Sequence, residues 1–217
     1  MASRGLFISF EGSEGCGKST QIERLGARLR ASGREVVTLR EPGGCPLGEK
    51  IRELLKFDPA GAGMTAEAEL LLFAASRAQL VREVIRPSLQ RGAVVLCDRF
   101  LDSTTVYQGV ARAIAPNTVA SVNAFASGGT LPEVTLLLDL EVGEGRRRAA
   151  ARKGPVDRME QEREEFYEAV RRGYLELAIS ESARIAVIDA SGDVQMVEAA
   201  ITAALTERLK GQFHGLL

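Results

Sequence analysis

The stretch that decides the fold is residues 6–20, LFISFEGSEGCGKST. Residues 6–10 are an apolar run typical of a buried β-strand. Residues 12–19 match the phosphate-binding loop pattern of two spaced glycines followed by Lys and Ser. In such a loop, backbone N–H groups and the N-terminus of the next helix surround an anion. The alternative is an ordinary glycine-rich turn with a solvated lysine, but a strand before the motif and a helix after it favour the phosphate site.

Similar apolar runs alternate with helical stretches along the rest of the chain. Partly β-branched runs at about residues 36–39, 94–97, 134–140 and 185–188 predict four more buried strands. Helices are expected after Lys18, from about residue 65 to 89, from 160 to 182 and from 193 to 209. This alternation predicts an α/β fold with a doubly wound, five-stranded parallel sheet, helices on both faces, and ligands at the carboxyl ends of the strands. Since neither a repeat nor a linker interrupts residues 1–217, a single domain is expected.

The composition is that of an ordinary globular chain. Hydrophobic residues make up 45% and charged residues 26%, which argues against a disordered or fibrous protein. The 28 basic residues nearly cancel the 29 acidic ones, so no nucleic-acid partner is expected. No apolar run is long enough to span a bilayer and no secretory signal opens the chain, so we expect no membrane partner and a cytoplasmic location. The three cysteines are widely spaced and are interpreted as reduced thiols.

Three side chains suit the binding of nucleotide phosphates and Mg²⁺. Lys18 is expected to reach the β- and γ-phosphates, and the hydroxyl of Ser19 to ligate the metal ion. Asp98 follows the run 94–97 and should lie at the carboxyl end of that strand, where a second metal ligand belongs. The alternative for Asp98 is a cap of the next helix.

The densest basic run of the chain lies between residues 145 and 158. It contains Arg146, Arg147, Arg148, Arg152, Lys153 and Arg158. Such a run is usually a solvated helix face. Here it follows the fourth predicted strand and is interrupted by Gly154-Pro155, which indicates a mobile basic flap at about residues 143–158. A flap of this kind would aim positive charge at a transferring phosphoryl group.

Several motifs, in the same order along nearly the whole chain, resemble those of bacterial thymidylate kinases. Besides residues 10–20, they are Glu41-Pro42-Gly43-Gly44, residues 46–52, residues 73–79, Asp98-Arg99, Tyr107-Gln108-Gly109 and Asp157-Arg158. Proteins of many different activities contain a phosphate loop, whereas the Glu-Pro-Gly-Gly turn and residues 73–77 are motifs much more specific to one family. The resemblance implies a P-loop kinase fold and an Mg²⁺-dependent enzyme that transfers the γ-phosphate of ATP to dTMP, giving dTDP for dTTP synthesis. It also implies a homodimer.

The same resemblance implies where ATP and the thymine base bind. Phe73 would stack on the base, Arg77 would donate to a base carbonyl, and Thr104 would bond the base N3; Phe73 and Arg77 are four residues apart on one helix and so face the same way. Without the family, Phe73 would be read as core packing and Arg77 as part of a surface ion pair. Residues 189–191 match an adenine-side loop, or a cap of the helix that follows. The implied ATP site is Gly12, Ser13, Glu14, Gly15, Cys16, Gly17, Lys18, Ser19 and Thr20.

Four other residues match family positions around the sugar and the acceptor phosphate. Tyr107 would lie beneath the deoxyribose and leave no room for a 2′-hydroxyl, and Glu14 would receive the 3′-hydroxyl. Arg99 would hold the acceptor phosphate, with Arg52 as a second ligand. The alternatives are an ordinary helix-surface tyrosine for Tyr107, and ion pairs with flanking glutamates for Arg52.

Members of this family keep a catalytic arginine either in the phosphate loop or in the flap. Gly15 occupies the loop position here, so the chain resembles the second kind, with Arg148, Arg152 or Lys153 assisting Lys18 and Arg99. The planar fork of arginine favours Arg152 or Arg148 over Lys153. Alanines at positions 149–151 interrupt the familiar flap pattern and leave the identity of the cation open.

Two other functions compete with this interpretation. One is a kinase for a different nucleoside or nucleotide, against which Phe73, Arg77 and Tyr107 argue. The other is a GTPase-type switch, since residues 189–192 fit a short Asp-x-x-Gly pattern, but the chain contains no Asn-Lys-x-Asp motif. A kinase acting on dTMP needs no dedicated base, because the acceptor phosphate is already largely a dianion at neutral pH.

Overall fold

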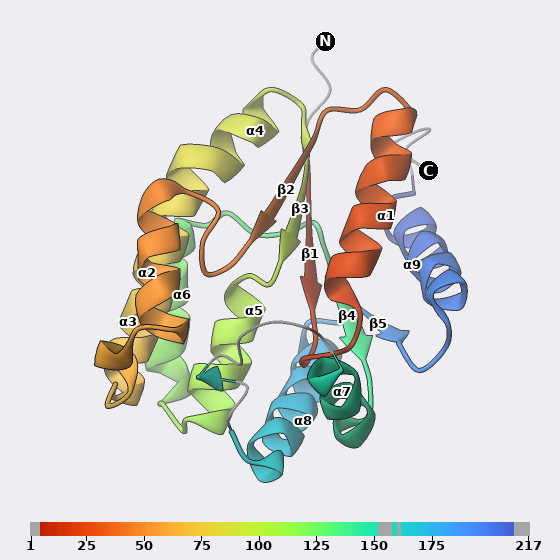
Figure 1. Ribbon diagram of the computed structural model, residues 1–217. Coiled ribbons are helices and arrows are strands. Elements are labelled where there is room, and N and C mark those ends of the chain that lie inside the picture. The colour runs from red at the N-terminus through yellow and green to blue at the C-terminus, as the bar shows by residue number, and fades with distance from the viewer. Residues whose placement is uncertain (1–4, 152–157, 160–161, 211–217) are drawn as a thin grey trace.

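A five-stranded, fully parallel sheet forms the centre of the molecule (Figure 1). The structure is a computed structural model and describes residues 5–151, 158–159 and 162–210. The strand order is β2-β3-β1-β4-β5, which confirms the predicted sheet. Each strand lies within a residue or so of its predicted bounds: β1 (Leu6–Glu11), β2 (Val36–Arg40), β3 (Val94–Asp98), β4 (Val134–Asp139) and β5 (Ile185–Asp189).

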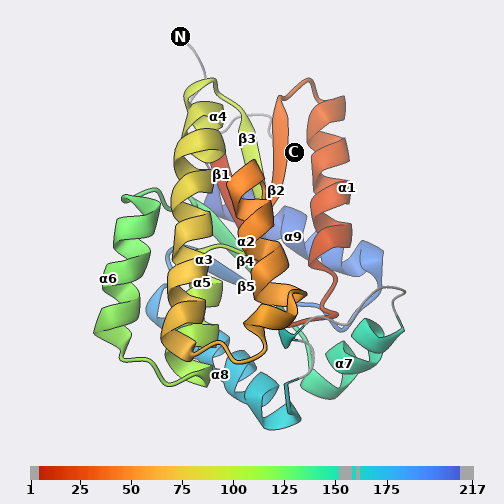
Figure 2. The ribbon, with the colours of Figure 1, turned by 60° about the vertical axis from the view of Figure 1, so that its left-hand side comes forward.

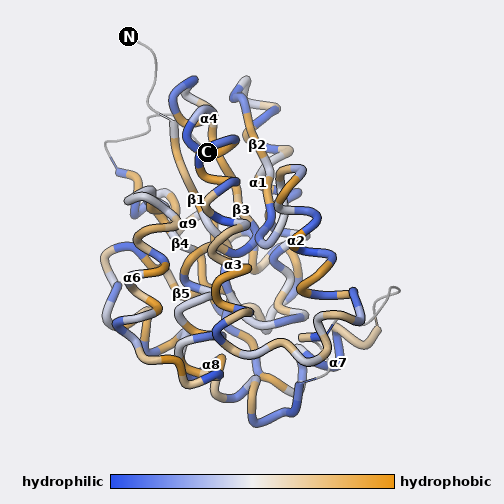
Figure 3. The backbone as a smooth tube through the Cα atoms, turned by 90° about the vertical axis from the view of Figure 1, so that its left-hand side faces the viewer, coloured by the Kyte–Doolittle hydropathy of each residue, from blue (hydrophilic) through white to orange (hydrophobic). Residues whose placement is uncertain are grey.

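Helices cover both faces of the sheet because successive strand residues point to opposite sides. Leu6, Ile8 and Phe10 of β1 pack against α1 (Lys18–Ala31) and α9 (Val194–Arg208) in one core cluster. Phe7 of β1 faces the other side, where it packs with the helical residues Leu80 and Ile85. Figure 3 shows the hydrophobic colour along the strands in the middle of the molecule.

The second face is covered by the larger group of helices. The segment predicted as one helix from 65 to 89 runs as α3, a π-helical turn η2 and α4, and Pro87 supplies the reason: it has no N–H to donate to the preceding turn. The helical segments Pro46–Lys56, Leu101–Thr104, Thr105–Ala111 and Pro116–Ser127 lie outside the predicted helical ranges. The helical segments here are α2 (Pro46–Lys56), η1 (Pro59–Gly61), α3 (Ala66–Leu80), η2 (Val81–Ile85), α4 (Arg86–Gln90), α5 (Leu101–Thr104), η3 (Thr105–Ala111), α6 (Pro116–Ser127) and α8 (Glu164–Ser180).

All strands point toward one end of the molecule, where α7 (Val142–Ala150) and α8 lie (Figures 1 and 2). β3 lies beside β1, with Phe10 paired to Asp98, so the two segments that follow these strands meet at this end. No described helix combines the length and the apolar character needed to cross a bilayer. All three cysteines are buried and unpaired with one another, as expected.

Candidate active site

The phosphate-binding loop connects β1 to α1. Gly12 has φ +129° and Gly17 has φ +92°, conformations that residues with a Cβ rarely adopt. The ammonium group of Lys18 is buried and donates to the carbonyl oxygens of Gly12 (3.0 Å) and Ser13 (2.9 Å). The loop therefore holds its own lysine at its centre, in reach of an anion bound by the backbone N–H groups.

Gly15 is in close contact with the first turns of α7. Its φ is +77°, and a Cβ at this position would lie 2.0 Å from the carbonyl oxygen of Gly145. A Cβ on Gly145 would in turn lie 2.7 Å from the carbonyl oxygen of Glu14. The backbone of α7 therefore fills the space that an arginine side chain at position 15 would need.

Ser19 and Asp98 meet at the edge of the loop. The Ser19 hydroxyl donates to Asp98 Oδ2 at 3.1 Å, which brings together the two predicted metal ligands. The alternative role for Asp98 is not observed, because Phe100 is the N-cap residue of α5. Among the described residues, no group of three or more His, Cys, Asp or Glu side chains could enclose a metal. One hydroxyl and one carboxylate fit Mg²⁺, which keeps several waters and takes its other ligands from phosphates.

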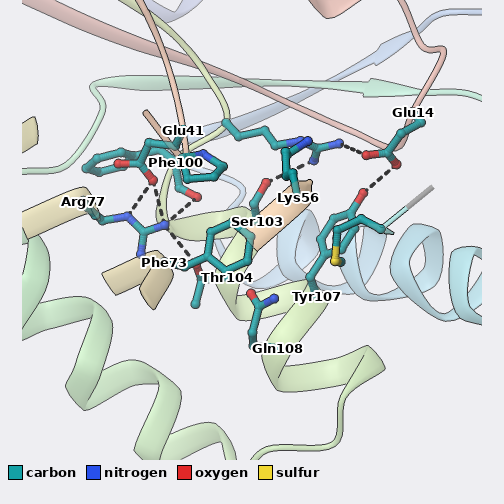
Figure 4. Close-up of a pocket in the computed structure, with 13 residues that line it drawn as sticks. Glu14, Glu41, Lys56, Phe73, Arg77, Phe100, Ser103, Thr104, Tyr107 and Gln108 are labelled. Atoms are coloured by element: carbon teal, nitrogen blue, oxygen red, sulfur yellow. Dashed lines mark hydrogen bonds and ion pairs between the residues drawn. The ribbon is translucent and has the colours of Figure 1, made fainter. Parts of the chain in front are cut away.

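Arg99, Glu14 and Tyr107 form one hydrogen-bonded group. Glu14 accepts from Arg99 Nη2 at 2.7 Å and from the Tyr107 hydroxyl at 2.9 Å, and the Arg99 guanidinium lies 5.0 Å from the centre of the Tyr107 ring. Burial by itself would raise the pKa of Glu14, but Arg99 and then Lys18 hold that pKa below its usual value. Glu14 is therefore an anionic acceptor, and Figure 4 shows it beside the Tyr107 hydroxyl.

Arg77 lies on the opposite side of the same pocket and is 1% exposed (Figure 4). Its Nε donates to Glu41 at 2.8 Å, its Nη1 to Asn123 at 2.7 Å, and its Nη2 to Thr104 at 2.9 Å. Nη2 also donates to the carbonyl of Phe100 at 3.3 Å. This buried arginine is not the surface ion pair considered as its alternative. Phe73 lines the pocket, so the structure brings Phe73, Arg77, Thr104 and Tyr107 together around one cavity.

The larger cleft beside the phosphate loop has a volume of about 900 Å³. Arg52 lines it and donates to the carbonyl of Pro42 at 3.0 Å. Arg148 also lines it, but its guanidinium donates to Glu144 (2.6 Å) and to the carbonyls of Ala190 (3.1 Å) and Ser191 (3.3 Å), on the loop predicted as adenine-side. The predicted residues Arg152, Lys153 and Asp157 lie outside the described residues.

Other parts of the basic run have partners of their own. Arg147 is 72% exposed and pairs with Glu144, as a solvated helix face would. Arg158 pairs with the buried Glu69 of α3 and donates to the carbonyl of Leu55 at 3.1 Å. Asp193, rather than Asp189, caps α9 through the N–H of Met196 at 2.8 Å.

Sequence reasoning missed several polar residues that hold this site together. Glu11 and Glu41 are named only as parts of motifs, while Ser103 and Tyr174 lie in no motif. Glu11 had a usable signal, since it ends an apolar strand just as Asp98 does. Tyr174 had none, because its contact with Glu11 joins residues that are 163 positions apart.

Comparisons with known proteins agree with the motifs. A family model described as thymidylate kinase matches residues 10–201. The thymidylate kinase of Deinococcus radiodurans is 50% identical over 206 residues, which cover 95% of this chain and 98% of that protein. The thymidylate kinase of Pseudomonas syringae pv. tomato is 50% identical over 208 residues, covering 96% and 98%. The crystal structure of thymidylate kinase from Ehrlichia chaffeensis superposes with a TM-score of 0.77 at 30% identity, covering 93% of this chain and 99% of that one.

Proposed function

This chain belongs to the thymidylate kinase family, and from that premise we propose how its residues divide the family's reaction among them. The chain is an ATP-dependent nucleoside monophosphate kinase that phosphorylates dTMP to dTDP. One observation carries the assignment of residues: Glu14 and Arg99 line both the cleft beside the phosphate loop and the pocket that contains Phe73 and Arg77. A phosphate held there would lie between the two substrates.

The donor side consists of residues 12–20. Its backbone would bind the ATP phosphates, and Lys18 would carry positive charge to the β- and γ-phosphates. Ser19 and Asp98 would hold Mg²⁺, which would neutralise charge on the same phosphates. The contact between the Ser19 hydroxyl and Asp98 supports this pairing of ligands.

The acceptor side binds dTMP from its base to its phosphate. Phe73 would stack on thymine. Nη1 of Arg77 gives one hydrogen to Asn123, and in the described part of the chain its other hydrogen has no partner and can be donated to a base carbonyl. Thr104 accepts from Arg77 and retains its own proton and a second lone pair for the edge of the base.

The sugar and the phosphate would meet the residues on the other side of the pocket. Tyr107 and Glu14 would contact the sugar, while Arg99 and Arg52 would hold the phosphate. The bulk of Tyr107 beside Glu14 supports this placement, since it limits the room at the sugar.

Catalysis would consist of positioning and charge stabilisation. The phosphate of dTMP can attack without a general base, because it is already largely a dianion at neutral pH. Lys18, Arg99 and a cation of the basic run would align it with the donor and spread the transition-state charge. Arg148, Arg152 and Lys153 are the candidates for that cation. Because Arg148 donates to two carbonyls of residues 190–191, it suits the nucleotide end of the cleft, which favours Arg152 for the transferring group.

We further propose a cytoplasmic homodimer in which residues 1–217 act as one domain. Leu71 on α3 is 60% exposed and Phe125 on α6 is 81% exposed, and these two helices pack together. A second copy covering these side chains would remove apolar surface from water.

The direct test is a coupled assay of ADP release with each deoxynucleoside monophosphate, each nucleoside and GTP as an alternative donor. The proposed site predicts the highest kcat/KM for dTMP with ATP. A preference for a nucleoside or for another base would contradict the assignment of Phe73, Arg77 and Tyr107. A preference for GTP would favour the switch-like alternative.

A further inference from the structure

Glu11 is a buried carboxyl group that the proposed mechanism does not use. It ends β1 and has no exposed surface. Its Oε1 accepts from the backbone N–H groups of Phe100 (2.7 Å) and Ser103 (3.3 Å). Its Oε2 accepts from the hydroxyls of Ser103 (2.6 Å) and Tyr174 (2.8 Å). Burying a carboxylate this deeply costs free energy unless hydrogen-bond donors surround it. Three of the four donors to Glu11 belong to Phe100 and Ser103, in the segment that follows Asp98.

The two hydroxyls that contact Glu11 also contact Arg99. Arg99 Nη1 lies 3.1 Å from Ser103 Oγ and 3.2 Å from the Tyr174 hydroxyl oxygen. A guanidinium nitrogen only donates, and each hydroxyl has a single proton. Both hydroxyl protons must therefore point away from Arg99 for these bonds to form. Glu11 Oε2 is an acceptor within reach of both protons, while the 2.8 Å contact between the hydroxyls can use only one of them.

We propose that Glu11 is a positioning residue for the acceptor phosphate, acting through Arg99. It would receive the protons of Ser103 and Tyr174, so that their lone pairs fix Arg99 Nη1, and it would anchor the backbone just after Arg99. This inference rests on the proposed role of Arg99 in binding the phosphate of dTMP.

This arrangement leaves two N–H groups of Arg99 that can bind the phosphate of dTMP. Nη1 bonds the two hydroxyl oxygens and Nη2 gives one hydrogen to Glu14 at 2.7 Å. Among the described residues, Nε–H and the second hydrogen of Nη2 have no partner, and Arg99 lines both cavities. Two N–H groups of a guanidinium match two oxygens of a phosphate.

The charged and titratable groups that surround Glu11 lie on several elements and together set its pKa. Asp102 on α5 is buried and forms an ion pair with the partly exposed Arg184 (2.7 Å), Arg99 follows β3, and Tyr174 lies on α8. Burial and then Asp102 raise the pKa of Glu11 to about 7, although Arg99 and the two hydroxyls act in the opposite direction. Above that pH Glu11 is ionised and can only accept hydrogen bonds, as the positioning role requires.

The test replaces the Glu11 carboxylate, a hydrogen-bond acceptor, by an amide of nearly the same shape. In Glu11→Gln, the amide oxygen can still accept the two backbone N–H groups, but the amide nitrogen donates to the hydroxyls and turns their protons toward Arg99. At about pH 8, the affinity for dTMP should fall roughly ten- to hundredfold, while the affinities for ATP and for thymidine, which lacks the phosphate, stay within about twofold. The measurements are titration calorimetry and kcat/KM for dTMP.

A matched control is Glu133→Gln. The Glu133 carboxylate also accepts a backbone N–H of β1, that of Phe7 at 2.8 Å, but at the other end of the strand. This variant should leave the ratio of dTMP to thymidine affinity unchanged. The double variant of Glu11→Gln with Arg99→Ala should lose no more dTMP affinity than Arg99→Ala alone, and additive losses would contradict the inference.

Arg99→Ala separates the inference from the function on which it rests. If it leaves the ratio of dTMP to thymidine affinity unchanged, the assignment of Arg99 to the phosphate is wrong. If Arg99→Ala lowers the ratio and Glu11→Gln does not, Glu11 has no positioning role. Equal losses for dTMP and thymidine in Glu11→Gln would make Glu11 a structural residue only. Should Glu11→Gln fail to fold, Tyr174→Phe decides: a smaller loss confined to dTMP supports the inference, and a loss shared with thymidine overturns it.

Discussion

The donor and acceptor sides of this site are built in opposite ways. The donor side is a loop of consecutive residues, and Lys18 bonds carbonyls of that same loop. On the acceptor side, Arg77 bonds residues that precede it by 36 positions and follow it by 46 positions, all within the core. The acceptor side is therefore part of the packed interior, and a substitution there changes stability as well as binding. On the donor side, function and stability should separate.

The largest effect is expected from the three candidate cations of the basic run, Arg148, Arg152 and Lys153. An arginine supplied to a phosphoryl-transfer transition state contributes about 10³–10⁵ in rate, so the triple change Arg148→Ala, Arg152→Ala and Lys153→Ala should lower kcat by a factor of that order. The KM values should change much less, as for an interaction made mainly in the transition state. Steady-state kinetics of the triple and single variants would measure this.

Arg147→Ala is the matched control for that series, since Arg147 lies on α7 next to Arg148 but its side chain is 72% exposed. It should leave kcat near the parental value. Arg148→Ala alone should raise the KM for ATP more than it lowers kcat, because two of its hydrogen bonds go to the carbonyls of residues 190–191, the loop predicted to lie beside adenine. A triple variant with near-parental kcat would show that the basic run is only a solvated face.

Lys18→Ala tests whether function separates from stability on the donor side. Loss of a positioned charge at the transferring group typically reduces turnover by about 10²–10³. The melting temperature should change little, because Lys18 itself lines the cleft beside the phosphate loop, so water can take the place of its ammonium group in the variant. Turnover within about threefold of the parent would contradict the role of Lys18, since one lost donor normally costs far more.

The same contrast explains what the sequence could predict. The strands, the phosphate loop and Asp98 follow from local patterns, because each depends on neighbours in the chain. The contact between Gly15 and Gly145 does not, since only the folded backbone brings residues 130 positions apart to the same place. The partners of Arg77 likewise come from α5, α6 and the turn at Glu41, so sequence spacing placed Arg77 on the right face of α3 but gave no reason to expect its complete burial.

Arg77→Ala should lower both the stability of the fold and the affinity for dTMP, whereas Lys18→Ala should lower turnover and leave stability nearly unchanged. Binding of dTMP should weaken by roughly 1.5–3 kcal/mol, as for a hydrogen bond to a charged group, with ATP affinity nearly unchanged. Unfolding should become easier by about 3–5 kcal/mol, because Glu41 would be left as a buried charge without its partner. Calorimetry and denaturant titration would measure the two effects.

A second change separates the two losses caused by Arg77→Ala. Adding Glu41→Gln removes the unpaired charge, so it should recover part of the stability but none of the dTMP affinity. Equal losses of dTMP and ATP affinity in Arg77→Ala would instead mean that Arg77 only supports the fold.

The smallest effect is expected at Tyr107, where ring and hydroxyl can be tested separately. The hydroxyl donates to Glu14 at 2.9 Å, and the ring lies against the Arg99 guanidinium. Tyr107→Phe keeps the ring, so the preference for deoxy over ribo acceptors should persist, while the missing hydrogen bond to Glu14 should lower the free energy of unfolding by about 0.5–1.5 kcal/mol. Tyr107→Ala removes the bulk that excludes a 2′-hydroxyl and should erode the preference itself. The measurement is the ratio of kcat/KM for dTMP to that for its ribose counterpart. If Tyr107→Ala keeps the full ratio, another side chain selects the sugar, and the acceptor side depends less on this packed ring than its burial indicates.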